Sequence, residues 1–297
     1  MSISLERVSA ATPAFFDADL RFDEDALREH YLWIQEHGVT GLTPNGSLGE
    51  YQALDPTERA RAVELAVECA QPGTIVMPGI GAQTTDQAVH WATQARDAGA
   101  NAVMALPPTG YRLSVDEALV HYERLAEVGI PVVVYNNPFD VKIDLVPDLL
   151  ARIAQLDNIV GVKEFSCDVR RIPEVVEKAP TMTPICGADD VLLESMLVGA
   201  RGWISGFANA LPRASMRLFE SGGDGTIADA VPLYLGVLPL FRWDSVPKFV
   251  QAIKLTLEVR GRRGGPTRSP RMPLTKDEHA AVVAASEAAL RLEQELA

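Results

Sequence analysis

Short runs of small and β-branched residues alternate along the chain with longer stretches whose apolar positions recur every three or four residues. The first pattern predicts buried parallel strands, and the second predicts amphipathic helices that cover them. Eight strand-like runs occur, at Arg7–Thr12, Thr40–Pro44, Thr74–Gly79, Ala102–Leu106, Pro131–Asn136, Ile159–Glu164, Thr183–Gly187 and Gly202–Gly206. The helical stretches between them include Asp23–His37, Pro56–Cys69, Thr85–Ala98, Val115–Glu127, Leu145–Ala154 and Val191–Val198.

Local signals mark the ends of several of these helices. The run Asp55-Pro-Thr-Glu58 supplies an N-cap acceptor, a proline at the first helical position and an acid in the first turn. Other helical stretches end on a glycine, which adopts a left-handed C-terminal conformation at little cost: Gly38, Gly99, Gly129 and Gly199. Strand ends recur every 19 to 34 residues, which predicts an α/β fold of the (β/α)8 TIM-barrel type. A doubly wound open sheet is the alternative, but the first strand is not followed by its Gly-x-Gly-x-x-Gly turn.

The strand pattern stops near Ser221–Gly225. Three helical stretches follow, at Ile227–Phe241, Val246–Val259 and Lys276–Leu296, with a basic Gly/Pro-rich loop at Arg260–Pro273. We therefore expect a barrel catalytic domain over residues 1–224 and a C-terminal three-helix extension over residues 225–297. We interpret this extension as an appendix to the barrel and not as a separate functional unit.

Composition narrows the range of partners. The chain has 297 residues with ordinary globular composition and a formal net charge of −13, which disfavours nucleic acid and anionic membranes as partners. The sequence contains no run of about 18 apolar residues, so we predict no membrane span. The N-terminus shows no signal-peptide pattern. The three cysteines have no metal-ligand spacing, so we expect free thiols in a reducing cytoplasm.

Barrel enzymes carry their reactive groups at the C-terminal ends of the strands. All five histidines fall in helical stretches or at their ends, which disfavours a metal site and a histidine base. One of the six lysines, Lys163, lies inside an apolar strand-like run. Burial disfavours its ammonium form and leaves a free amine, which imine formation with a ketone requires. A structural pair between Lys163 and a glutamate inside the barrel is the alternative.

Two other strand ends carry candidate groups. Tyr135, in Tyr135-Asn136-Asn137-Pro138, places a phenol where it can relay protons, or it fills the barrel as an ordinary aromatic residue. Ser47 lies in the turn Asn45-Gly-Ser-Leu-Gly-Glu50, whose glycines favour inward-pointing amides that can hold a carboxylate. A plain surface turn is the alternative there.

Short motifs, including those that contain Ser47, Tyr135 and Lys163, occur along the chain. They are Thr12-Pro13, Gly46-Ser-Leu-Gly-Glu50, Gly79-x-Gly81, Tyr135-Asn136-x-Pro138, Gly161-Val-Lys163-Glu164, Gly187-x-Asp-Asp190, and Gly202-Trp-Ile-Ser205 with Ala208-Asn209. In their order and spacing these motifs resemble the dihydrodipicolinate synthase / N-acetylneuraminate lyase superfamily of class I Schiff-base aldolases. The resemblance spans the whole chain, including its C-terminal helices.

The resemblance implies a (β/α)8 barrel that acts on a small-molecule 2-oxo acid without a metal or organic cofactor, usually as a homo-oligomer (a tetramer or a dimer). By position, Lys163 would form the imine and Tyr135 would relay protons. Ser47, with the backbone of Ser47 and Leu48, would hold the substrate carboxylate, and the carbonyl of Ile204 would line the imine pocket.

The chain departs from the lysine-pathway synthases of this superfamily at three places. Leu48 replaces their second hydroxyl residue in the strand-two turn, and Thr109-Gly110 stands where they carry a paired tyrosine. Asp140 stands where they carry an arginine that clamps the carboxylate of the semialdehyde, so an anionic second substrate would be repelled there. Asp140 instead suits hydroxyl or amino groups, and we expect Asp189 and Asp190 to help at the same mouth.

We therefore predict a Schiff-base lyase that acts on pyruvate or a hydroxylated 2-oxo acid by aldol cleavage, condensation or dehydration. The enzymatic alternatives are a 4-hydroxy-tetrahydrodipicolinate synthase and a hydroxypyrroline-carboxylate deaminase. The run Lys163-Glu-Phe165 resembles the corresponding run of the deaminase subgroup. The non-enzymatic alternative is a regulator that binds a 2-oxo acid without turnover.

Overall fold

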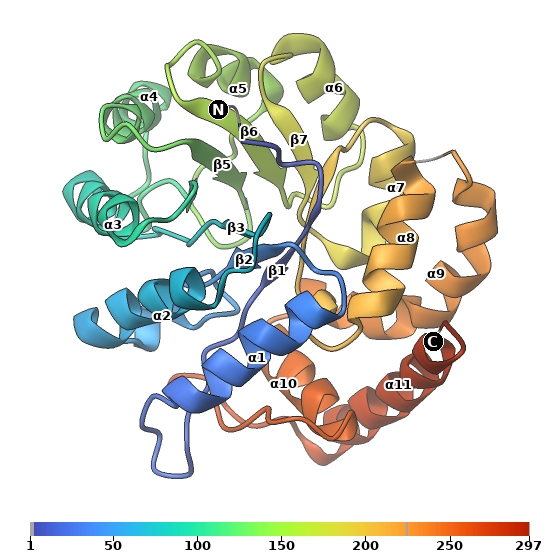
Figure 1. Cartoon of the computed structure of the whole chain (residues 1–297). Helices are drawn as coiled ribbons and strands as arrows, with labels where there is room; N and C mark the ends of the chain where they lie inside the picture. Colours follow the sequence, from blue (N-terminus) through green and yellow to red (C-terminus); the bar gives the residue numbers. More distant parts are fainter. Residues whose placement is uncertain (1–2, 224, 297) are drawn as a thin grey trace.

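Eight parallel strands form the centre of the described part of the molecule (Figure 1). The computed structural model describes residues 3–223 and 225–296. The strands are β1 (Val8–Ala11), β2 (Gly41–Thr43), β3 (Ile75–Val76), β4 (Val103–Ala105), β5 (Val132–Asn136), β6 (Ile159–Glu164), β7 (Thr183–Cys186) and β8 (Gly202–Ser205). Each observed strand lies within one of the eight predicted runs.

The strands close into a barrel. Their hydrogen-bonded order is β3-β2-β1-β8-β7-β6-β5-β4, so that β1 and β8 are neighbours. A parallel bridge between Gly79 and Met104 joins the two end strands. There the Met104 amide donates to the Pro78 carbonyl and the Ile80 amide donates to the Met104 carbonyl, each at 2.9 Å. The predicted (β/α)8 architecture is therefore confirmed.

Helices surround the strands (Figure 1). Those of the barrel are α1 (Glu24–Glu36), α2 (Pro56–Cys69), α3 (Thr85–Ala98), α4 (Val115–Ala126), α5 (Pro147–Ile153), α6 (Arg171–Lys178), α7 (Leu192–Leu197) and α8 (Pro212–Gly223). The predicted cap of α2 is present, because the Asp55 carboxylate accepts from the amides of Thr57 and Glu58. The four glycines predicted to end helices have φ angles between 80° and 117°, which is the left-handed region expected there. In none of the described helices is there an apolar stretch long enough to cross a bilayer.

Two barrel helices, α6 and α8, are absent from the helices that the sequence pattern singled out. Helix α6 is eight residues long and its N-cap, Arg170, makes no side-chain capping bond. Helix α8 begins at Pro212 and ends in Gly222 and Gly223. Helix α6 therefore lacks a local start signal. Helix α8 has a proline at its first position, but its first amides donate to Glu293, far along the chain, and packing on the barrel stabilises both helices.

The alternation of side chains along each strand separates two hydrophobic clusters. Tyr135 and Val133 of β5 belong to the cluster that includes Ile185 of β7 and the barrel interior. Val132 and Val134 belong to the other, together with residues of α4 and α5. Since successive side chains of a strand point to opposite faces, Tyr135 and its register partner on β6 point into the barrel.

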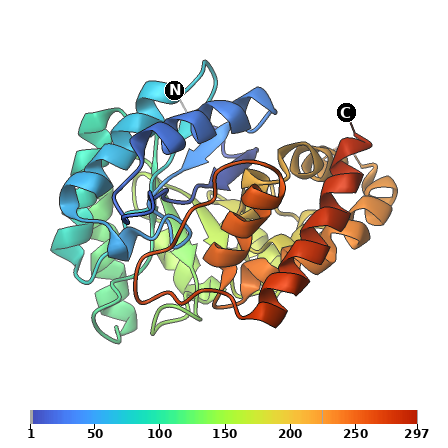
Figure 2. The same ribbon diagram turned by 90° about the horizontal axis from the view of Figure 1, so that it is seen from below.

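The C-terminal extension contains α9 (Ile227–Phe241), α10 (Phe249–Val259) and α11 (Lys276–Gln294), which match the three predicted helical stretches. Helix α9 packs against α8 and α11, and α10 packs against α11. A short 3-10 helix, η4 (Arg242–Ser245), joins α9 to α10. The long loop between α10 and α11 leaves the helices and reaches back toward the barrel (Figure 2).

Candidate active site

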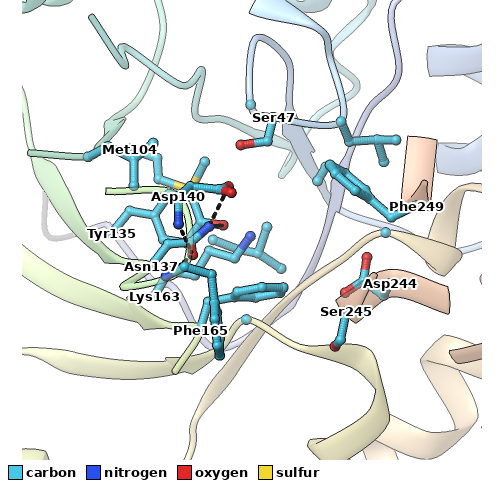
Figure 3. A pocket seen from close by; sticks show the side chains of 18 of the residues that line it. Ser47, Met104, Tyr135, Asn137, Asp140, Lys163, Phe165, Asp244, Ser245 and Phe249 are labelled. Atoms are coloured by element: carbon cyan, nitrogen blue, oxygen red, sulfur yellow. Dashed lines mark hydrogen bonds between the residues drawn. The ribbon is translucent and has the colours of Figure 1, made fainter. Parts of the chain in front are cut away.

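A cavity of about 590 Å³ opens at the C-terminal ends of the barrel strands. Six of the seven residues that the sequence predicted for the site line it: Ser47, Leu48, Tyr135, Asp140, Lys163 and Ile204. They come from the loops or ends of β2, β5, β6 and β8. Figure 3 shows Tyr135, Lys163 and Asp140 on one side of the cavity, with Asp244 and Phe249 of the extension opposite them.

Lys163 lies on β6 beside Tyr135 of β5, with 6% of its surface exposed. Its Nζ is 4.4 Å from the centroid of the Tyr135 ring and 5.5 Å from that of Phe165. Burial lowers the pKa of the Lys163 ammonium from its ordinary value, although the nearby Asp244 and Asp189 carboxylates oppose the shift. The environment thus favours a neutral, nucleophilic amine at the cavity wall.

The alternative of a structural pair between Lys163 and a glutamate does not hold. Glu164, the next residue along β6, accepts from Asn136 Nδ2 at 3.0 Å and from the Ser166 amide at 2.6 Å. Over residues 3–223 and 225–296, Lys163 Nζ has neither a hydrogen-bond acceptor nor a carboxylate within 4.0 Å. Its amine is therefore available to a ligand.

Tyr135 takes part in a short hydrogen-bonded chain. Asn137 Nδ2 donates to the Tyr135 hydroxyl at 3.1 Å and to Asp140 Oδ2 at 2.8 Å (Figure 3). Burial, and then the Asp140 charge, raises the pKa of the Tyr135 phenol well above its ordinary value. Because its oxygen accepts from Asn137, the phenol keeps its own proton free to donate into the cavity.

The turn after β2 presents unpaired backbone amides. Asn45 and Glu50, at its two ends, adopt left-handed φ angles of 58° and 49°. Within the described part of the chain, the amides of Ser47 and Leu48 have no hydrogen-bond acceptor. Of the two glycines in the turn, Gly46 and Gly49, close packing requires only Gly49. A Cβ on Gly49 would lie 2.9 Å from the Asn45 nitrogen and 3.1 Å from the Thr12 carbonyl. Two neighbouring free amides beside a hydroxyl form a site for a carboxylate.

Asp189, the seventh predicted residue, does not line the cavity, and its predicted contact with substrate needs correction. Its side chain is fully buried and accepts from Trp203 Nε1 at 2.9 Å, Ser205 Oγ at 3.1 Å and the Phe207 amide at 2.8 Å. Three donors satisfy the carboxylate, so it holds the end of β8 in place. Asp190 also lies outside the lining and accepts from Ser245 Oγ at 2.9 Å. In the described residues, no group of three His, Cys, Asp or Glu side chains is placed to hold a metal ion.

The C-terminal extension supplies lining residues that sequence reasoning missed. They are Asp244, Ser245, Val246, Pro247, Phe249 and Arg271. Asp244 is 8% exposed, and burial raises the pKa of its carboxyl to about 6. Arg271 places a cation on the same wall, which the prediction that Asp140 repels an anionic second substrate did not take into account. No local motif marks either residue. The extension, which we interpreted as an appendix to the barrel, supplies part of the wall of the barrel's cavity.

Comparisons with known proteins agree with this geometry. The chain matches the dihydrodipicolinate synthetase family over residues 4–289. A 4-hydroxy-tetrahydrodipicolinate synthase of Methanothrix thermoacetophila is 31% identical over 268 residues, which cover 89% of this chain and 90% of that protein. An uncharacterized DapA-like lyase of Halobacterium salinarum is 33% identical over 270 residues, which cover 91% of this chain and 89% of that protein.

Solved structures share the whole fold. The 4-hydroxy-tetrahydrodipicolinate synthase of Methylacidiphilum fumariolicum SolV superposes with a TM-score of 0.92 at 25% identity, covering 99% of both chains. A sialic acid aldolase of Ruminococcus gnavus superposes with a TM-score of 0.91 at 21% identity, again over 99% of both chains, and shows the fold alone.

The barrel and its buried, unpaired lysine define a class I lyase of the aldolase type, which works through a Schiff base. More particularly, the chain belongs to the dihydrodipicolinate synthetase family. The family resemblance inferred from the sequence motifs is therefore confirmed.

Proposed function

We propose that the protein holds pyruvate or a hydroxylated 2-oxo acid as an imine on Lys163 and then makes or breaks a bond at C3. The observation that carries this proposal is the buried Lys163 amine, which has no partner among the described residues and faces the cavity beside Tyr135. The amine attacks the C2 carbonyl and water leaves, and the resulting iminium withdraws electrons from C3. C3 can then lose a proton, or its bond to C4 can break.

The other predicted residues have positions that suit their roles. Tyr135 relays the proton that leaves with water, since its hydroxyl is free to donate toward the cavity. Ser47 and the amides of Ser47 and Leu48 bind the C1 carboxylate. The carbonyl of Ile204, at the end of β8, lines the imine pocket.

Asp140 favours a hydroxylated substrate. It lies on the cavity wall, exposed, where one of its oxygens accepts from Asn137 at 2.8 Å. Its other oxygen can accept from a substrate hydroxyl or amino group, but it offers nothing to a second carboxylate. We therefore favour an aldolase or dehydratase of a hydroxylated 2-oxo acid. The names of the relatives keep a 4-hydroxy-tetrahydrodipicolinate synthase as the second candidate.

Borohydride trapping tests the imine. Pyruvate and borohydride together should inactivate the protein and add one reduced pyruvate to Lys163, located by peptide mass spectrometry. Lys254 is a matched control within the same chain, because it is equally buried but donates to Glu50 at 2.9 Å. Labelling of Lys254, or of no lysine, would refute the Schiff-base assignment.

A substrate panel identifies the reaction. Hydroxylated 2-oxo acids, a hydroxypyrroline carboxylate, and pyruvate with aspartate semialdehyde would be incubated with the protein and assayed for aldehyde, loss of water, ammonia and condensation product. The proposal expects aldehyde release or water loss. Condensation alone would favour the synthase, ammonia would favour the deaminase, and trapping without turnover of the panel would favour a 2-oxo-acid-binding regulator.

The proposed assembly is a homo-oligomer, a tetramer or a dimer, in the cytoplasm. Leu197 of α7 and Leu235 of α9 are 71% and 58% exposed on two helices that pack together. A neighbouring subunit would cover such apolar side chains. The free thiols of Cys69, Cys167 and Cys186 agree with a reducing compartment. Light scattering coupled to gel filtration tests the assembly, and a monomeric mass would contradict it.

A further inference from the structure

The loop between α10 and α11 is anchored both before and after Arg271, by contacts with the barrel helix α2 and with α10. Before Arg271, Lys254 Nζ donates to the Pro266 carbonyl at 2.7 Å. Arg268 forms two short bonds to the Glu58 carboxylate, of 2.5 and 2.7 Å. After Arg271, Gln251 Nε2 donates to the Met272 carbonyl at 2.7 Å. The position of Arg271 is thus set by buried or partly buried anchors and not by its own contacts.

The guanidinium of Arg271 lines the cavity with its donors nearly unused. Its hydrogen bonds are long, at 3.4 Å to the Ser47 carbonyl and 3.5 Å to the Pro247 carbonyl. The nearest carboxylate within the described residues, that of Glu50, is 4.0 Å from Arg271 Nε. Both oxygens of Glu50 already accept elsewhere, from Lys254 Nζ at 2.9 Å and from the Arg268 amide at 3.0 Å. A guanidinium has five donors in a planar fork, so Arg271 can receive a carboxylate in two-point contact.

The cavity therefore offers two places to bind an acid group. The free amides of Ser47 and Leu48 suit the C1 carboxylate of an imine on Lys163. Arg271 lies next to this turn, with one nitrogen 3.4 Å from the Ser47 carbonyl, but on the wall that the extension builds with Pro247 and Phe249. We propose that Arg271 binds a distal carboxylate, so that the preferred substrates are 2-oxo acids with a second acid group. This inference rests on the proposed imine at Lys163. Asp140, also on the lining, accepts from a hydroxyl or amino group of the same substrate.

Matched 2-oxo acids test this without the unknown reaction. The probes are 2-oxoglutarate and 2-oxoadipate, compared with 2-oxopentanoate and 2-oxohexanoate, which replace the distal carboxylate with a methyl group. The measurement is the concentration of each acid that gives half-maximal borohydride labelling of Lys163. We expect at least one dicarboxylate to label at a concentration roughly 10- to 100-fold lower than its monocarboxylate counterpart, as hydrogen bonds to a charged group allow.

Arg271→Gln should abolish this preference, and it should change half-maximal labelling by pyruvate and by the monocarboxylates much less than labelling by the dicarboxylates. Arg271→Lys keeps the positive charge but loses the planar, two-point donor geometry of the guanidinium, so it should retain part of the preference for dicarboxylates. Arg263→Gln is the matched control, because Arg263 lies in the same loop, is 62% exposed, and pairs with Asp23 outside the cavity. The control should behave as the wild type.

The outcomes separate this inference from the proposed function. If pyruvate does not label Lys163 in the wild type, the proposed function fails and the inference fails with it. If pyruvate labels Lys163 but neither dicarboxylate is preferred, or the preference survives Arg271→Gln, the inference alone fails. If Arg271→Gln weakens labelling by pyruvate as much as by the dicarboxylates, Arg271 serves the C1 carboxylate and the inference is also overturned.

Discussion

Replacing Lys254 with methionine should destabilise the protein and weaken 2-oxo acid binding, although Lys254 does not line the cavity. Lys254 Nζ donates to Glu50 at 2.9 Å, and the two side chains are 2% and 1% exposed. Glu50 ends the turn that carries Ser47, and Lys254 also holds the loop that carries Arg271, through the Pro266 carbonyl. One buried ammonium ion therefore fixes two parts of the proposed substrate site.

The expected magnitude follows from the burial of the pair. Methionine keeps most of the apolar volume but leaves the Glu50 carboxylate buried, with the Arg268 amide at 3.0 Å as its remaining short partner. Removing one member of a buried ion pair typically costs about 3–5 kcal/mol. In a chain of this size 1 kcal/mol corresponds to roughly 2–4 °C, so we expect Tm to fall by roughly 6–20 °C.

The assay compares Tm by circular dichroism, at one scan rate, for the wild type, Lys254→Met, Glu50→Gln and the double variant. The double variant should lose less stability than the sum of the single variants, because it leaves no unpaired buried charge. Lys248→Met is the control, since Lys248 pairs with Glu278 through side chains that are 27% and 33% exposed, and should cost at most about 1 kcal/mol. Half-maximal labelling by pyruvate should also require more pyruvate in Lys254→Met. Equal losses in Lys254→Met and Lys248→Met, or strictly additive losses in the double variant, would refute the reasoning.

Three further predictions concern the cavity itself. Lys163→Ala should abolish borohydride labelling and turnover without lowering Tm, because it removes a buried amine that has no partner among the residues the structure describes. A large loss of Tm would show a structural role. Ser47→Ala should weaken pyruvate binding by about 1–2 kcal/mol, one hydrogen bond to a charged group, as measured by half-maximal labelling; unchanged labelling would leave the carboxylate to the backbone amides alone. Burial raises the pKa of Asp244 to about 6, above its unfolded value, so the folded state binds this proton more tightly, and stability is lost as pH rises from about 4 through about 6. Asp244→Asn should therefore gain roughly 1–3 kcal/mol of unfolding free energy relative to the wild type between pH 4 and pH 7 in urea titrations; a constant difference across this range would contradict the shift.

Much of the barrel was predictable because its signals are local. A buried parallel strand is a short apolar run whatever it packs against, and the glycine that ends a helix is required by its own φ angle. The position of Lys163 was predictable for the same reason, since an ionisable residue within such a run is conspicuous. Helices α6 and α8 were not singled out because their stabilising contacts are not local: α6 has no capping side chain, and the first amides of α8 donate to Glu293.

The composition of the cavity wall depends on contacts between distant parts of the chain. Asp189 comes shortly after the end of β7, where active-site residues of a barrel are expected. Its carboxylate instead accepts hydrogen bonds from Trp203 and Ser205 of β8, outside the cavity. Asp244 and Arg271 lie in segments without a motif, and they reach the cavity because the extension packs beside the barrel mouth. Sequence patterns report the backbone periodicity and burial of one segment at a time. The direction and partner of a polar side chain depend on which donors and acceptors the fold brings within about 3 Å of it, and these come from anywhere in the chain.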